Sequence, residues 1–148
     1  MALSTTEYIQ INQALFSLVH AYESRMAQDA NNVIGLALAD CSVLMVLHQF
    51  APLNSARLAR IMDINPGTIS LYVQRLVEKG LVAKEQDADD RRNWWLTLTG
   101  PGQTVAGEVV ASAAAYTRDF LAALDKDEQR TLHGLLLKAS HSLGFEWQ

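Results

Sequence analysis

The chain has 148 residues and a mass of 16.3 kDa, the length of one domain, and its 49% apolar and 19% charged residues exclude a broadly disordered protein. The 12 Lys and Arg against 16 Asp and Glu give a formal charge of −4, which disfavours a protein coated all over with nucleic acid. No apolar run approaches the roughly 18 residues of a membrane span, and residues 1–8 lack the basic and apolar segments of an export signal. We therefore expect a cytoplasmic protein with no membrane partner.

The first predicted element is a long amphipathic helix within residues 1–30. Apolar side chains recur at steps of three and four, which is the spacing of one helix face: Tyr8, Ile11, Leu15, Leu18, Tyr22 and Met26. Phe16 and Val19 widen this face. A helix with such a broad apolar face usually packs against two neighbours, so we expect it to serve its own core and a partner chain.

A second helix is predicted after Asn31 and Asn32 interrupt this pattern. Asp40 suits its N-cap, and apolar residues follow at helical spacing until Pro52 ends the helix. Cys41 is the only cysteine and cannot form an internal disulfide. Because the carboxylate of Asp40 would raise the pKa of this thiol, we predict a buried structural cysteine rather than a redox sensor. No Cys and His cluster has zinc spacing, so we expect neither a metal nor a cofactor.

Two short helices are predicted next, over 55–62 and 66–79, joined by a tight turn. Asn65 can cap the second of these helices, and Pro66 stands at the first helical position, where its missing N–H costs nothing. Gly80 is suited to the left-handed conformation that ends a helix. Strands are predicted at 81–84 and 93–98, joined by a polar run.

Helical sequence resumes after the hairpin. Gly100 to Gln103 marks the restart, and an alanine-rich helix follows to about Leu124, whose small residues would let another helix approach closely. Asp125 and Glu128 have the spacing of a capping box and predict a last helix through Leu137. Two short helices followed by a β-hairpin make a winged helix-turn-helix, whose second helix can enter the DNA major groove.

The predicted second helix has the two sides that this role needs. Its apolar side consists of Ile69, Val73, Leu76 and Val77. On the other side, Thr68 and Ser70 can donate to phosphates or base edges, Gln74 can pair with adenine, and Arg75 can bind phosphate or guanine. Free backbone N–H groups at Gly67 add a small anion site.

The hairpin tip alone is typical of an ordinary solvated turn, but its position beside a recognition helix favours DNA binding. Arg91 and Arg92 on an extended ribbon can reach a narrow minor groove, where the potential is most negative. Asp90 would orient an arginine, since phosphates repel a carboxylate. Residues 50–100 carry seven basic and six acidic residues, whereas the flanks carry five and ten, which also points to a central contact region.

At this point the sequence resembles the MarR family of bacterial transcription regulators. The resemblance rests on the following segments: Leu58-Ala59, 67–70, 75–82, the tip 87–92, the Leu-Thr element 96–99 and Gly102. It implies a mainly α fold with a small β-wing, in which 33–100 form the winged helix-turn-helix and 1–30 and 101–148 form dimerisation helices. It also implies a homodimer that grips a pseudo-palindrome, with 66–79 in the major groove and the wing, residues 85–93, at the minor groove.

The expected contacts to double-stranded DNA follow from this arrangement: Ser55, Asn65, Gly67, Thr68, Ser70, Leu71, Gln74, Arg75, Arg91 and Arg92. Leu71 departs from the family, in which an arginine or other polar residue often stands there. It would either contact a thymine methyl or make the protein bind DNA less tightly. The two tryptophans are bulkier than is usual in the family. Strand alternation places Trp94 toward the core with Leu96 and Leu98, and Trp95 on the exposed face.

The resemblance further implies a pocket for a small aromatic or anionic effector. His20, His48 and Tyr116 are polar groups on otherwise apolar helices that could line it. A lone polar residue of this kind is more often a hydrogen-bonded residue at the edge of the core than a ligand contact.

Two classes of function remain after the sequence is considered. The favoured one is a ligand-responsive homodimeric repressor that binds DNA. The alternative is a winged-helix module for protein–protein interaction that lacks specific DNA binding. The negative net charge and the apolar Leu71 favour this alternative. We expect no enzyme, because the chain has no nucleophile elbow and no phosphate loop, and its Asp-rich turn lacks the glycine and distal glutamate of a calcium loop.

Overall fold

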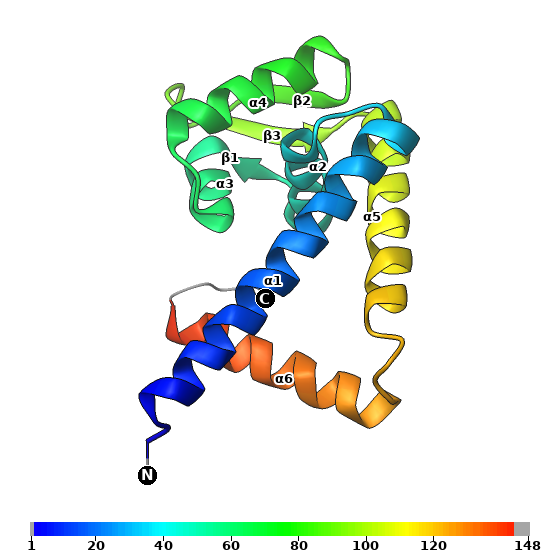
Figure 1. The fold of residues 1–148 in the computed structure, drawn as a ribbon. Coiled ribbons are helices and arrows are strands. Elements are labelled where there is room, and N and C mark those ends of the chain that lie inside the picture. Colours follow the sequence, from blue (N-terminus) through cyan, green and yellow to red (C-terminus); the bar gives the residue numbers. More distant parts are fainter. Residues whose placement is uncertain (1, 144–148) are drawn as a thin grey trace. The chain divides into compact units, whose positions relative to one another are not determined.

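The computed structural model describes residues 2–143, which fall into two compact units, 1–38 and 39–148 (Figure 1). The first unit consists of α1, Thr5–Asp29, and the π-helix η1, Ala30–Ile34. Ser4 and Glu7 form a capping box that starts α1, since the Ser4 backbone N–H donates to Glu7 Oε2 and the Glu7 N–H donates to Ser4 Oγ. The predicted break at Asn31 and Asn32 falls within η1, so it is a change of helix type rather than a loop.

The second unit contains the winged helix-turn-helix. Its elements in chain order are α2, Leu38–Phe50; β1, Leu53–Asn54; α3, Ser55–Met62; α4, Pro66–Glu78; β2, Val82–Gln86; and β3, Trp94–Leu98. α3 packs against α4, β1 and β3, and α4 also contacts β2. Their apolar sides form a core with fully buried side chains: Val43, Leu44, Leu53, Leu58, Ile69, Leu76 and Leu96. Each such burial contributes about 1.5–3 kcal/mol.

The structure corrects the prediction for the start of the second helix. α2 begins at Leu38, so Asp40 is not the N-cap but lies within the first turn. Its side chain is buried instead of capping the helix end. The sequence pattern was misleading because a carboxylate is also favourable inside the first turn of a helix.

The wing belongs to a three-stranded antiparallel sheet with the strand order β1-β3-β2. Lys84 of β2 and Leu53 of β1 both lie opposite Leu96, the central residue of β3. β2 extends to Gln86, further into the wing than predicted. The sequence did not reveal β1, since two residues are too short to show an alternating pattern.

The two tryptophans of β3 are placed differently from the prediction. Trp94 is 41% exposed, because it lies beyond Leu96 at the wing end of the sheet, where the Lys84 ammonium lies 5.6 Å from its ring centroid. Trp95 is half-buried, and its indole N–H is hydrogen-bonded to the wing. Toward the wing, Leu96 is therefore the last residue of β3 whose side chain is buried in the core.

The remaining helices of the second unit are α5, Gly100–Phe120, and α6, Lys126–Ser142. α5 begins at the predicted restart, contacts β3, and ends before the predicted limit at Leu124. The predicted capping box of Asp125 and Glu128 is confirmed at the start of α6. None of the helices in the described range is long and apolar enough to cross a membrane.

Candidate nucleic-acid interface

The turn between α3 and α4 sets the direction of the recognition helix. α3 ends at Met62, and its C-cap Asp63 adopts a left-handed conformation with φ 51°, a geometry that the short side chain of Asp tolerates. Asn65 Oδ1 then accepts a hydrogen bond of 2.8 Å from the Gly67 N–H, and Pro66 follows the cap, as predicted. Gly80 ends this segment with φ 71°.

α4 has one buried and one exposed side. Ile69, Val73 and Leu76 are buried, whereas Leu71 is 59% exposed. Val77, which was predicted to lie on the buried side, is 36% exposed, because it sits at the edge of the buried stripe near the end of the helix. Ser70 and Gln74 are also exposed, while Thr68 and Ser55 are half-buried. The outward surface of α4 is thus mostly uncharged.

Two of the predicted contact residues already make hydrogen bonds within α4. The Ser70 hydroxyl donates to the Pro66 carbonyl at 3.0 Å. Gln74 Nε2 donates to Glu78 Oε1 at 3.0 Å. The Gln74 amide keeps its second N–H and its carbonyl oxygen, the two groups that a bidentate contact with adenine uses.

Arg75 is the predicted contact residue with the strongest partner. Its Nη2 lies 2.7 Å from Oδ1 of the buried Asp40, and its guanidinium carbon lies 4.9 Å from the ring centroid of Tyr72. The hydrogen bond that Arg75 donates to Asp40 is the main reason that the pKa of Arg75 is raised above its ordinary value. No sequence signal links Asp40 to Arg75, since they are 35 residues apart.

Asp87 organises the wing. Its Oδ1 accepts hydrogen bonds from the backbone N–H groups of Asp90 and Asp89, and its Oδ2 accepts one of 2.6 Å from the Trp95 indole. These donors, led by the backbone of Asp90, lower the pKa of Asp87. The sequence did not reveal this role of Asp87, because the indole partner lies in the following strand.

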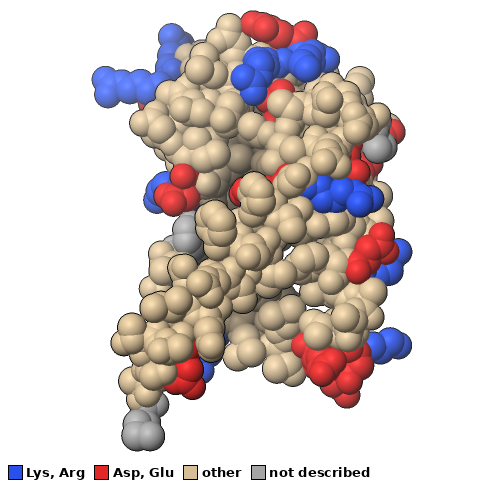
Figure 2. All heavy atoms as spheres, viewed as in Figure 1, with Lys and Arg blue, Asp and Glu red and all other residues tan. Residues whose placement is uncertain are grey.

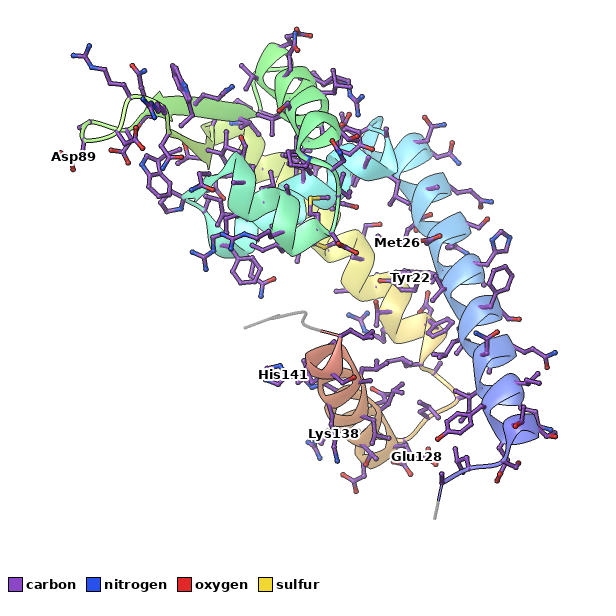
Figure 3. All side chains as sticks on the ribbon, turned by 90° about the vertical axis from the view of Figure 1, so that its left-hand side faces the viewer. Tyr22, Met26, Asp89, Glu128, Lys138 and His141 are labelled. Carbon is purple, nitrogen blue, oxygen red and sulfur yellow. The ribbon has the colours of Figure 1, made fainter. Side chains whose placement is uncertain are left out.

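The two wing arginines are both exposed. Asp90 Oδ1 accepts a bond from the backbone N–H of Arg92 at 3.0 Å, so the contact of Asp90 is with the wing backbone rather than with a guanidinium. Gln86 Nε2 donates to the Arg91 carbonyl at 2.7 Å. Figure 3 shows Asp89 at the outer tip of the wing, and blue side chains stand out around α4 and the wing in Figure 2.

Thr99 links the end of β3 to the segment between α4 and β2 and to the start of α5, a role that the sequence did not reveal. Its hydroxyl donates to the Gly80 carbonyl at 2.6 Å, and the same oxygen accepts from the Gly102 N–H at the start of α5. The Thr99 N–H donates to the carbonyl of Leu81. A Cβ at Gly102 would overlap that Leu81 carbonyl, so only glycine fits there.

The residues predicted for an effector pocket are distributed over the two units. His20 lies on α1, where its exposed ring stacks on Phe16 at a centroid distance of 6.4 Å. In the second unit, His48 is exposed on α2, and Tyr116 is half-buried on α5, 6.2 Å from Phe120. Within residues 2–143, no group of three or more His, Cys, Asp or Glu side chains could hold a metal ion.

A short recognition helix with a tight turn before it and an antiparallel wing after it defines a winged helix-turn-helix DNA-binding protein. A family model described as MarR family matches residues 36–94. A Mycobacterium bovis protein named as an HTH-type transcriptional repressor is 30% identical over 105 residues, which cover 71% of this chain and 76% of that protein. A Thauera aromatica protein, named as a putative transcriptional regulatory protein for the hcr operon, is 33% identical over 64% of this chain, and the match spans 57% of its own length.

Solved structures agree with these matches. The crystal structure of a probable transcriptional regulator from Pseudomonas aeruginosa is similar with a TM-score of 0.75 at 30% identity, and the match covers 88% of this chain and 96% of that one. This chain belongs to the MarR family of transcriptional regulators. It is a DNA-binding regulator, and the family's regulators bind DNA and function as dimers.

Proposed function

We propose that this chain is a homodimeric repressor that binds a pseudo-palindromic operator in the cytoplasm. The observation that carries the proposal is the exposed side of α4 beside a wing that presents Arg91 and Arg92. In a two-fold symmetric dimer, two recognition helices would meet half-sites about one helical turn, near 10 base pairs, apart.

The proposed contacts divide between the two grooves. In the major groove, Leu71 contacts a thymine methyl, and Gln74 pairs with adenine. Ser55, Asn65, Thr68 and Ser70 near the helix starts bind phosphates. The Gly67 N–H, predicted to be free for an anion, donates to Asn65 Oδ1 instead, so Gly67 contributes only a close approach of the backbone. At the minor groove, the exposed arginines of the wing bind, while Asp90 holds the backbone that carries them.

The dimer is proposed to form through the flanking segments 1–30 and 101–148, around the winged helix-turn-helix of 33–100. Large apolar side chains stand exposed on α1 and α6, including Leu15, Leu18, Leu135 and Leu136. The visible surface of α1 is accordingly almost free of charge in Figure 2. Extended apolar patches of this kind mark interfaces.

The proposed effector is a small aromatic or anionic compound that weakens operator binding. His20, His48 and Tyr116 are the candidate contacts, because each brings a polar group to a largely apolar helix. Imidazole N–H groups and a phenol hydroxyl can bind a carboxylate, and their rings can stack on an aromatic ligand.

Selection of fragmented DNA from the source organism with the purified protein tests the proposal. We expect recovery of a short inverted repeat, with an affinity that falls with salt by a log-log slope of about −0.9 per phosphate neutralised. Arg92→Ala should make this slope shallower by about 1, whereas Lys138→Ala on α6 should leave it unchanged. A folded dimer that retains no specific sequence would contradict the proposal and favour the protein-interaction module.

A further inference from the structure

Asp40 is an unusual residue for its position. It is 2% exposed, and it is the one charged residue in the buried set of the described chain. Neighbouring residues of α2 such as Val43 and Leu44 are fully buried and apolar. Placing a carboxylate there is costly unless a partner compensates it, and an apolar residue of similar size would often stabilise the fold as well or better. The presence of a charge at this position therefore points to a role beyond packing.

The partner of this carboxylate comes from the recognition helix. Arg75 reaches across to α2, with its Nη2 2.7 Å from Asp40 Oδ1, and its side chain remains 43% exposed. The ring of Tyr72, one turn earlier on α4, lies under the guanidinium. A guanidinium has five N–H donors in one rigid plane, so a bond at one nitrogen and a ring on one face fix the direction of the others.

We propose that Asp40 is a positioning residue for DNA recognition, which holds the Arg75 guanidinium at the edge of α4 in the orientation that binds a phosphate or a guanine. A free arginine on the surface would have to be ordered when DNA binds, at a cost in side-chain entropy. Asp40 orders it in the unbound protein. This inference rests on the proposed function, because it concerns the same DNA surface.

The electrostatic sign makes the proposal testable. Asp40→Leu removes a negative charge near the DNA surface, so charge alone predicts tighter binding to every sequence. The positioning role predicts the opposite for the operator. We expect operator affinity to fall by about tenfold or more, while affinity for random DNA stays equal or rises, so that the ratio of the two falls. Asp40→Asn, which keeps a neutral acceptor for Arg75, should give an intermediate ratio.

A double-mutant cycle shows whether Asp40 acts through Arg75. Arg75→Ala alone should lower the ratio and also the stability, because it leaves the buried carboxylate without its partner. Adding Asp40→Leu to Arg75→Ala should recover stability without any further loss of the ratio. Urea unfolding and the measured dimer mass separate folding effects from binding effects in each variant.

Failure of the proposed function and failure of the Asp40 inference give different results. If the wild-type protein binds no sequence specifically, the proposed function fails before any variant is compared. If the wild type is specific and the ratio for folded Asp40→Leu equals that of the wild type, then the pair is only structural and this inference is wrong.

Discussion

The core of the winged helix-turn-helix buries its large apolar side chains, whereas the helices α1 and α6 leave most of theirs exposed. In the core, Leu44, Leu58, Ile69 and Leu96 are fully buried by other parts of the same unit. α6 has no buried residue, and Met26 is the one buried residue of α1. Leucines on these helices remain about half exposed, including Leu15 at 50% and Leu135 at 59%.

This difference indicates which part of the molecule would gain most from the proposed dimer. A side chain that is already buried gains nothing from association, whereas exposed leucines on a regular helix face gain about 25 cal/mol for each Å² that a partner covers. The stability of the core should therefore not depend on the protein concentration, whereas the stability of α1 and α6 should rise with it.

The largest effect should come from a charge on the apolar face of α1. We expect Leu15→Glu to weaken dimerisation at least a hundredfold, because an unpaired carboxylate would be buried in the interface at a cost of several kcal/mol. Light scattering measures the mass, and operator binding should fall with it. Gln13→Glu places the same charge on the opposite, exposed side of α1 and should change neither. A dimer that survives Leu15→Glu would remove α1 from the proposed interface.

The next largest effect concerns the close packing of the second unit. Gly102→Ala should destabilise the fold by about 1–3 kcal/mol, since the added Cβ would collide with the Leu81 carbonyl. Gly107→Ala in the same helix meets no atom within 4 Å and should be neutral, or stabilise by up to about 1 kcal/mol. Urea unfolding compares the two variants. Equal stabilities would show that the junction at Thr99 is looser than its hydrogen bonds indicate.

A smaller effect is expected in the wing. Because the hydrogen bonds of Asp87 lower its pKa in the folded protein, the stabilisation is complete above about pH 4, the ordinary value for Asp, and is lost as the pH falls through the lowered pKa. The indole N–H signal of Trp95 in NMR spectra should therefore stay constant from pH 7 to about pH 4 and shift below it.

Substitution at the same position sharpens this test. Asp87→Asn should shift the Trp95 indole signal already at pH 7 and weaken operator binding by about threefold to tenfold, because it removes the ionised acceptor that orders the wing. Asp89→Asn at the wing tip removes the same charge and is the matched control, which should leave the indole signal in place and should not weaken operator binding. If both variants behave alike, Asp87 does not order the wing.

The smallest effect, close to zero, is expected at Cys41. Burial, and then the charge of Asp40, raise the pKa of this thiol, so the reactive thiolate is scarce at neutral pH. Peroxide should leave the operator affinity of the wild type and of Cys41→Ser equal. Release from DNA by peroxide that Cys41→Ser abolishes would make this position a redox sensor and overturn the prediction of a structural thiol.

The features that could be predicted from the sequence depend on residues close together in the chain. The cap at Asn65, the capping box of Asp125 and Glu128 and the left-handed Gly80 each follow from rules that connect residues two to four positions apart. The order of the helices and of the two wing strands, though not the short β1, followed from such signals, and together they indicated the winged helix-turn-helix. The candidate contact residues on α4 followed from helical periodicity alone, and their binding to DNA remains a prediction.

The features that the sequence did not reveal depend on contacts between distant segments. Asp40 resembled an N-cap by its local pattern, yet the structure buries it beside Arg75, 35 residues further along the chain. Strand alternation predicted a core-facing Trp94 and an exposed Trp95. Because the buried part of β3 does not extend from Leu96 to Trp94, Trp94 is exposed, and Trp95 is half-buried. The sequence by itself therefore determined the helices, the two strands of the wing, the capped helix starts at Asn65 and Asp125, and the family resemblance, because local hydrogen bonds and periodicity specify them. Only the tertiary structure decided which charged and aromatic side chains meet, because burial and pairing depend on how the segments pack.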